Sequence, residues 1–179
     1  MTIAFLAALA THIVVQLWLS LRQTLHVAAH RNEVPPAFAD AVSAAEHTKA
    51  ADYTVARQRF GRLELVFDAI VLLVLTLGGG IAALGQLATA IAGANPIWAG
   101  TLHVLLALLA ISLASLPFSV WRTFVLEAGF GFNRTTPAVF VVDLLKAIAL
   151  GGLLGGGVVA LVLWTMQASG ARWWLIAWA

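Results

Sequence analysis

Two histidines could do chemistry together, because His26 and His30 are four residues apart in a stretch that is expected to be helical. Residues at that spacing share one face of a helix, and the H-E-x-x-H motif uses such a pair of imidazoles to bind zinc. However, Val27 stands where that motif has the glutamate that activates water, and no third ligand is evident nearby. We therefore interpret the pair chiefly as a basic cluster with Arg22 and Arg31, and a metal role for His26 and His30 as the weaker alternative.

A second polar set lies inside an apolar run near the N-terminus. His12, Gln16 and Ser20 recur every four residues and so share one helical face. Polar groups inside a membrane need partners from protein or water, because lipid chains offer none. Two interpretations stand equal: hydrogen bonds between helices, or the wall of a water-filled chamber.

The overall composition places these groups in a membrane protein. Of the 179 residues, 61% are hydrophobic and 10% are charged, and the mean hydropathy is +0.95. This exceeds what a soluble domain needs to fill its core. The net charge of +2 comes from scattered residues, which argues against a nucleic-acid partner. The absence of cysteine excludes disulfides and thiolate ligands.

Four apolar runs are long enough to cross a bilayer as helices, which takes about 20 residues. They cover residues 2–21, 65–92, 98–118 and 144–166, and a truncated fifth run covers 173–179. No basic residue precedes the first run, so we expect an uncleaved helix and not a signal peptide. We predict an all-α, polytopic membrane protein, with four full transmembrane helices and the start of a fifth in a single membrane domain, 1–179.

The basic residues predict the orientation of these helices. All Lys and Arg residues except Arg172 lie in or beside the connections 22–64 and 119–143. The positive-inside rule makes both connections cytoplasmic and the N-terminus external. Tryptophans at the ends of the runs agree with two aromatic belts, with Trp98, Trp164, Trp173 and Trp174 outside and Trp18 and Trp121 inside.

Prolines and glycines interrupt the pattern at three places. Pro35 and Pro36 break the long connection 22–64, which we expect to form a helical hairpin at the membrane surface. The glycines at 78–80 and 151–157 have small-xxx-small spacing, so we expect close helix packing there in preference to a broken helix.

The connection between the third and fourth runs carries several polar residues. Pro117 predicts a kink or a helix end where the chain leaves the membrane. Gly129 and Gly131 allow the backbone to turn, and Asn133 tolerates the unusual dihedral angles of such turns. Thr135–Pro137 then predicts a helix cap followed by a first-turn proline. The predicted local structure is a helix, a tight aromatic turn and a second helix.

Short segments across the whole chain have a characteristic order and spacing: Val34-Pro35, Lys49-Ala50-Ala51-Asp52-Tyr53-Thr54, Phe60-Gly61, Leu116-Pro117, Thr123-Phe124-Val125-Leu126-Glu127, Gly131-Phe132-Asn133 and Asp143. In this order they resemble the N-terminal half of the type I CAAX prenyl proteases. The sequence departs from many relatives at Ala128-Gly129-Phe130, where those relatives carry further charged residues. The H-E-x-x-H motif of the family is absent.

The resemblance implies a barrel of seven transmembrane helices around a hydrated chamber, with zinc held by a later helix of the intact protein. Residues 1–179 would then form part of the chamber wall of a zinc endopeptidase and contain no catalytic residue and no zinc ligand. The positions expected near the chamber or substrate are His12, Gln16, Pro117, Arg122, Glu127 and Asn133.

The resemblance also implies partners and a location. The partners are membrane lipid, a C-terminal catalytic portion in cis or as a separate half, and prenylated or membrane protein substrates. The location is the bacterial inner membrane or the endoplasmic reticulum. Two other functions stay open: a stand-alone membrane scaffold or binding protein of the same fold, and a small transporter, although no dedicated ion site is evident.

Overall fold

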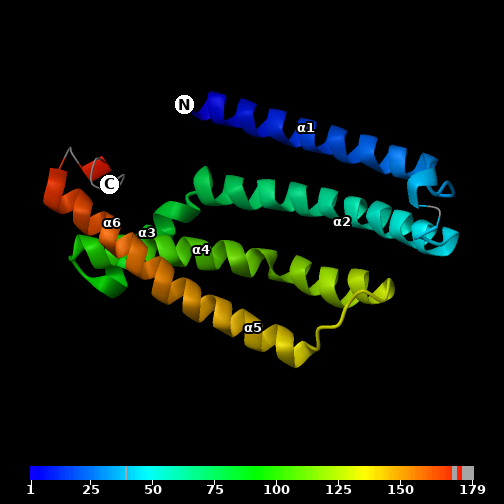
Figure 1. The fold of residues 1–179 in the computed structure, drawn as a ribbon. Coiled ribbons are helices and arrows are strands. Elements are labelled where there is room, and N and C mark those ends of the chain that lie inside the picture. The colour runs from blue at the N-terminus through cyan, green and yellow to red at the C-terminus, as the bar shows by residue number, and fades with distance from the viewer. Residues whose placement is uncertain (39, 171–172, 175–179) are drawn as a thin grey trace. The chain divides into compact units, whose positions relative to one another are not determined.

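The computed structural model describes residues 1–38, 40–170 and 173–174, and within these residues every regular element is a helix (Figure 1). The all-α prediction is confirmed. The α-helices are α1 (Thr2–Ala29), α2 (Ala44–Thr76), α3 (Gly80–Ala92), α4 (Pro96–Trp121), α5 (Pro137–Leu150) and α6 (Gly156–Ser169). A short 3₁₀ turn covers Pro36–Phe38, and two π-helical segments, Arg122–Glu127 and Gly151–Gly155, extend α4 and join α5 to α6.

Several of these helices have the length and composition of membrane spans. Among the described residues, three continuous segments qualify: Thr2–Ala29, Pro96–Glu127 and Pro137–Ser169. A fourth qualifies when α2 and α3 are taken together, and these two helices are bent by 57° at the break between them. The predicted runs 2–21, 65–92, 98–118 and 144–166 each fall within one of these segments. Except for residues 173–174, the predicted fifth run lies outside the described residues.

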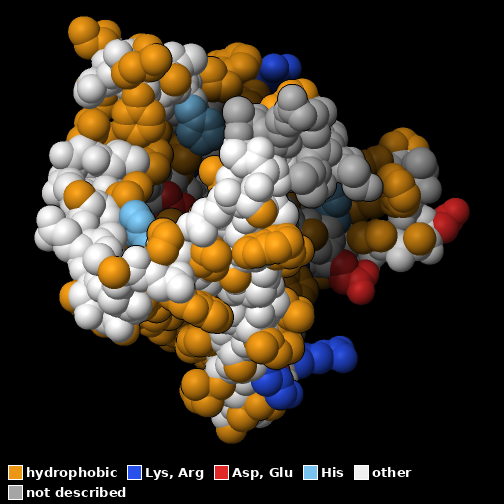
Figure 2. All heavy atoms as spheres, turned by 90° about the vertical axis from the view of Figure 1, so that its left-hand side faces the viewer, with side chains coloured by type: hydrophobic (Ala, Val, Ile, Leu, Met, Phe, Trp, Pro, Cys, Tyr) orange, Lys and Arg blue, Asp and Glu red, His pale blue; other side chains and the backbone are white. Residues whose placement is uncertain are grey.

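Hydrophobic side chains lie mainly on the outside of the molecule. The buried hydrophobic residues of the described chain are Ala51, Ala69 and Ala88, whereas many large aliphatic and aromatic side chains are exposed. Figure 2 shows hydrophobic side chains over much of one face, with few charged groups among them. A soluble protein would not expose so large an apolar area, so this surface is suited to contact with lipid.

The glycine triplet at 78–80 breaks the second span. Gly79 has a φ of +80°, in the left-handed region that glycine alone enters without strain. A Cβ on Gly78 would lie 2.6 Å from the carbonyl oxygen of Val74. The expectation of close helix packing at this triplet is therefore wrong, because these glycines end α2 and allow α3 to start in a new direction.

The described residues divide into two compact units. Unit 1 consists of Met1–Leu72 and Phe118–Arg134, and unit 2 of Leu73–Pro117 and the described part of Thr135–Ala179. In unit 2, the His103 ring on α4 donates from Nε2 to the Ile81 carbonyl on α3 at 2.9 Å. The Cβ position of Gly156 lies 3.3 Å from Leu105, so this glycine of the second glycine-rich run does permit close packing.

In unit 1, α1 and the first part of α2 lie side by side and antiparallel (Figure 1), joined by the connection 30–43. A row of polar contacts links them, which we call the polar seam (Ser20, Gln23, Thr24, Gln58 and Arg62). Ser20 Oγ donates to Gln58 Oε1 at 2.8 Å, and Gln58 Nε2 donates to Gln23 Oε1 at 2.7 Å. Arg62 Nη1 donates to the hydroxyls of Ser20 and Thr24 at 3.1 and 3.3 Å.

Replacing Gly79 with alanine is expected to lower the free energy of unfolding by about 1–2 kcal/mol, because a Cβ is disfavoured in the left-handed region. Gly61→Ala is the matched control. That glycine lies inside α2 with open space around its Cβ position, where alanine is favoured over glycine by up to about 1 kcal/mol. Thermal unfolding of both variants in one detergent measures the difference, and a Gly79→Ala protein as stable as wild type would contradict it.

Candidate functional site

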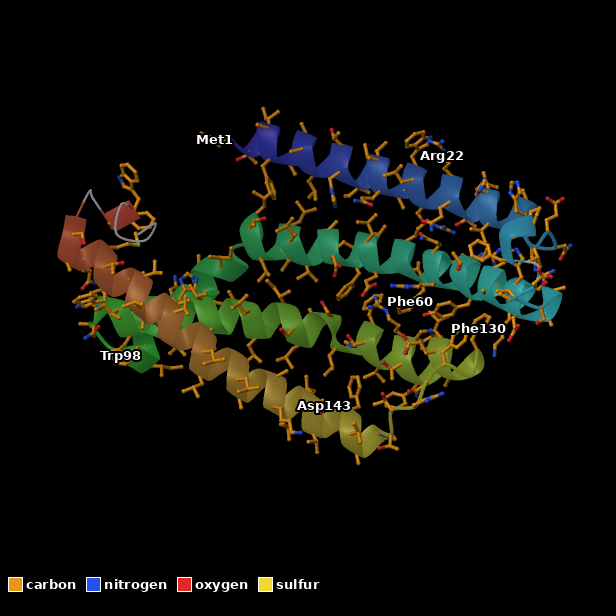
Figure 3. The ribbon with its side chains drawn as sticks, in the orientation of Figure 1. Met1, Arg22, Phe60, Trp98, Phe130 and Asp143 are labelled. Atoms are coloured by element: carbon orange, nitrogen blue, oxygen red, sulfur yellow. The ribbon has the colours of Figure 1, made fainter. Side chains whose placement is uncertain are left out.

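An ion pair joins α2 to the segment that follows α4 in unit 1. Arg122 Nη2 donates to Glu64 Oε2, and the two side chains keep 38% and 23% of their exposure. The Arg122 guanidinium also lies 6.0 Å from the centre of the ring of Phe60, the residue labelled on α2 in Figure 3. Phe60 and Phe67 in turn contact Phe118, with ring centres 5.7 and 4.8 Å away. A charge at the end of an apolar helix thus has both a partner and an aromatic cover.

The backbone widens where this ion pair is made. Arg122 opens the π-helical segment that extends to Glu127, a geometry that is often found at functional sites. The helix does not end at Pro117, because α4 continues through it to Trp121 and into the π segment. Of the two outcomes predicted for Pro117, a helix end is therefore wrong. A proline inside a membrane helix removes one hydrogen bond, which such helices tolerate.

The turn after this segment is closed by one carbonyl. The backbone oxygen of Glu127 accepts from the N–H groups of Phe132 at 2.9 Å and of Asn133 at 3.3 Å. Gly131 has a φ of +72° and supplies the unusual dihedral angle. Among the described residues no other residue type has a positive φ, so the conformational role expected of Asn133 is wrong. Gly129 is still helical and does not turn the chain.

Side chains from α2 hold this turn in an aromatic clamp, defined as Lys49, Tyr53, Phe130 and Phe132, of which Phe130 is labelled in Figure 3. The Tyr53 ring meets Phe130 and Phe132 edge-on, at centre distances of 5.4 and 4.9 Å. The two phenylalanine rings are within 13° of parallel, and Lys49 Nζ lies 5.0 Å from the centre of the Phe132 ring. Edge-to-face and cation–π contacts of this kind fix ring positions, so the clamp ties the turn to α2.

The start of α2, which carries half of the clamp, is itself well anchored. Ser43 and Glu46 form a reciprocal capping box: Ser43 N–H donates to Glu46 Oε2 at 3.0 Å, and Glu46 N–H donates to Ser43 Oγ at 3.2 Å. The hydrogen bond from the Ser43 hydroxyl, followed by that from its backbone, lowers the pKa of Glu46. Arg31 donates two hydrogen bonds of 2.6 Å to Asp52, which lower the pKa of this carboxyl.

The predicted cap after the turn is confirmed. Thr136 is the N-cap of α5, and its Oγ1 accepts from the Val139 N–H at 3.3 Å. Pro137 follows as the first helical residue. Further along α5, the Lys146 Nζ and Asp143 Oδ1 atoms are 3.9 Å apart on an exposed surface.

The polar face predicted on α1 divides in two. Ser20 belongs to the polar seam, as the interpretation of hydrogen bonds between helices requires. His12 and Gln16 are exposed in α1, and their assignment to a chamber wall stays a prediction. The same holds for the chamber roles of Pro117, Arg122, Glu127 and Asn133.

The candidate metal ligands do not converge as a zinc site requires. The rings of His26 and His30 are 4.4 Å apart, and His30 Nδ1 donates to the His26 carbonyl at 2.9 Å. His47 Nε2 donates to the His30 carbonyl at 3.1 Å, and all three rings line a pocket of about 720 Å³ together with Glu33. Within residues 1–38, 40–170 and 173–174, no three His, Asp or Glu side chains are placed to hold a metal ion. These residues therefore do not fit zinc.

The geometry of unit 1 is thus that of a frame that fixes a turn. Sequence reasoning singled out Arg122, Glu127 and Asn133 but missed Glu64, which is 58 residues from its partner Arg122. It also missed His103, whose ring connects α4 to α3 in unit 2 through its hydrogen bond to the Ile81 carbonyl. A search for a carboxylate near the start of the second apolar run would have returned Glu64 and Asp68 as candidates, because Arg122 needs a partner at that depth.

Comparisons with known proteins agree with this architecture. A family model described as the CAAX prenyl protease N-terminal region, with five membrane helices, matches residues 23–179. The CAAX prenyl protease 1 homolog of Caenorhabditis elegans is 27% identical over 184 residues, covering 97% of this chain and 39% of that protein. The homolog of Oryza sativa is 43% identical over 58 residues, covering 32% of this chain and 14% of that protein.

The crystal structure of S. mikatae Ste24p has a similar fold. It matches this chain with a TM-score of 0.85 and 22% identity, covering 95% of this chain and 40% of that one. At this identity the likeness shows the fold alone. The chain thus spans less than half the length of each of these relatives.

The Arg122–Glu64 pair is expected to show a coupling energy of about 1 kcal/mol in a double-mutant cycle of Arg122→Gln, Glu64→Gln and the double variant. Because both side chains are partly buried, replacing one of them should leave the charge of the other poorly solvated and lower the free energy of unfolding. Thermal or denaturant unfolding of the four proteins measures the coupling. The exposed pair Lys146 and Asp143 is the matched control, for which we expect a coupling near zero. Equal couplings for both pairs would contradict the special role given to Arg122 and Glu64.

Proposed function

Because this chain belongs to the CAAX prenyl protease N-terminal family, we propose that it forms the chamber-lining membrane region of a zinc-dependent endopeptidase and is not itself catalytic. The observation that carries the proposal is the match of the family model to residues 23–179, which is nearly the whole chain. In this proposal the zinc ligands and the general base belong to a C-terminal catalytic portion, joined in cis or supplied as a separate half.

The proposal explains why contacts with α2 fix the position of the segment 122–133 in unit 1. The ion pair of Arg122 and Glu64 and the aromatic clamp hold the segment 122–133 against α2 at two positions, one near each end of the segment. A preorganised support of this kind is what a hydrolytic site needs around its substrate. We assign Pro117, Arg122, Glu127 and Asn133, with His12 and Gln16 on α1, to the surface that faces the chamber or the substrate.

The proposed substrates are prenylated proteins or other membrane proteins, and the proposed location is the endoplasmic reticulum or the bacterial inner membrane. With the basic connections 22–64 and 119–143 on the cytoplasmic side, the N-terminus is external. The exposed apolar surface supports membrane lipid as a constant partner.

The first test compares this chain with the same chain extended by whatever its gene encodes after residue 179. We expect the short chain to bind no zinc and to leave a prenylated CAAX peptide intact. We expect the extended protein to bind about one zinc ion and to cleave the peptide, as metal-assisted hydrolysis requires. Metal analysis and a peptide cleavage assay measure both. Stoichiometric zinc in the short chain would overturn the proposal, and an extended protein without zinc or activity would favour a scaffold of the same fold.

A second test addresses the turn. In the extended protein, Asn133→Ala is expected to lower kcat/KM by about tenfold or more, because small displacements near a substrate have effects of this size. Asn32→Ala is the matched control, since that asparagine is exposed in the connection between α1 and α2. Unchanged kinetics of Asn133→Ala at normal membrane levels would remove Asn133 from the site.

A further inference from the structure

The polar seam between α1 and α2 contains a half-buried cation, Arg62, that is held by neutral groups. Its Nη1 donates to the hydroxyls of Ser20 and Thr24, and a hydroxyl oxygen does not neutralise the charge. Among the described residues, Arg62 has no carboxylate within ion-pair distance. The N–H groups on Nε and Nη2 take part in neither of these two bonds. The guanidinium therefore remains positively charged and has further N–H donors for a ligand.

The acidic residues of α1 and α2 do not neutralise Arg62, because they are distant from it or are paired with other residues. Helix α1 carries no Asp or Glu along its whole length. On α2, Asp68 is exposed six residues beyond Arg62, which is about 9 Å along the helix. The other three acidic residues of α2 have partners: Glu46 has Ser43, Asp52 has Arg31, and Glu64 has Arg122. The seam is therefore positively charged.

The seam also lies where the two helices become apolar. Ser20 is at the end of the run 2–21 and Thr24 lies three residues after that run, whereas Arg62 comes three residues before the run 65–92. On α1, the Arg22 guanidinium lies 5.7 Å from the centre of the Trp18 ring (Figure 3). Arg–Trp pairs of this kind are typical of the membrane interface, where lipid headgroups lie. Arg59, one turn before the half-buried Arg62, adds an exposed cation on the same side of α2.

From this arrangement we propose that the seam binds the headgroup of an anionic phospholipid, with Arg62 as the principal contact and Arg59 and Arg22 as supporting charges. A guanidinium presents a planar fork that matches two oxygens of one phosphate, and such charge-assisted bonds are the strong ones. The depth of the seam favours a lipid over a soluble anion, because the acyl chains of a bound lipid lie against the apolar parts of α1 and α2. This site does not depend on the protease function proposed above.

The test reconstitutes the 179-residue chain in phosphatidylcholine vesicles and measures the association of spin-labelled phosphatidylglycerol and spin-labelled phosphatidylcholine by electron paramagnetic resonance. We expect wild type to prefer phosphatidylglycerol. Arg62→Gln should lower its association about fivefold, the effect of one cation near the surface, and leave phosphatidylcholine unchanged. The matched control is Arg57→Gln, which removes one exposed arginine from a different side of α2 and should retain the preference.

Three outcomes would overturn the proposal. Equal losses for Arg62→Gln and Arg57→Gln would mean that only the general surface charge attracts the lipid. Displacement of labelled phosphatidylglycerol by inorganic phosphate would mean that the site binds a soluble anion. If Arg62→Gln loses its helical circular dichroism, Arg62→Lys replaces it, because lysine keeps the charge without the fork. A lysine variant that is indistinguishable from wild type would then exclude recognition by the guanidinium.

Discussion

The pairing of Arg122 with Glu64 is the constraint on which the rest of unit 1 depends. The pair aligns α2 with the segment after α4 at one point. On α2, Tyr53 lies about three helical turns before Glu64. On the other segment, Phe130 and Phe132 lie a similar distance after Arg122, and both rings contact Tyr53. The two segments therefore run antiparallel in one register, which the ion pair sets at one end and the aromatic clamp at the other. Arg122, a charged residue at the end of a membrane helix, thus helps to position the turn at 130–133.

Local features of the fold could be predicted from the sequence because they depend on neighbouring residues. The apolar runs predict helices by length and composition, and Thr136 before Pro137 predicts the start of α5 by the chemistry of one turn. Features that depend on distant packing could not. No local pattern connects Glu64 to Arg122, and nothing in the composition distinguishes the π-helical segment from an α-helix. The glycines at 78–80 show why: small residues serve close packing and left-handed turns alike, and the surrounding backbone decides between them.

The polar groups of α1 and α2 illustrate two solutions to one problem. Most of them satisfy each other, as Ser20, Gln23 and Gln58 do through consecutive hydrogen bonds. Such contacts replace water at the edge of the membrane and hold the helices in register. Arg62 differs, because the partners that the described part of the chain gives it are two hydroxyls on one nitrogen, which carry no negative charge. A charge that is half-buried without a counter-ion is costly unless something outside the chain completes it. Lipid is the component of the environment that is always available there.

The ion pairs of the described chain differ in how strongly they stabilise the fold, because their side chains differ in exposure to water. Lys146 and Asp143 are 3.9 Å apart with 68% and 65% of their side chains exposed, so water screens their attraction almost completely. Arg31 and Asp52 make two short hydrogen bonds at 44% and 43% exposure, which fixes the connection between α1 and α2 more by geometry than by charge. Arg122 and Glu64 are the least exposed and connect segments far apart in the chain. Because the loss of one partner there leaves the other charge poorly solvated, this pair constrains the turn at 130–133 more strongly than either surface pair.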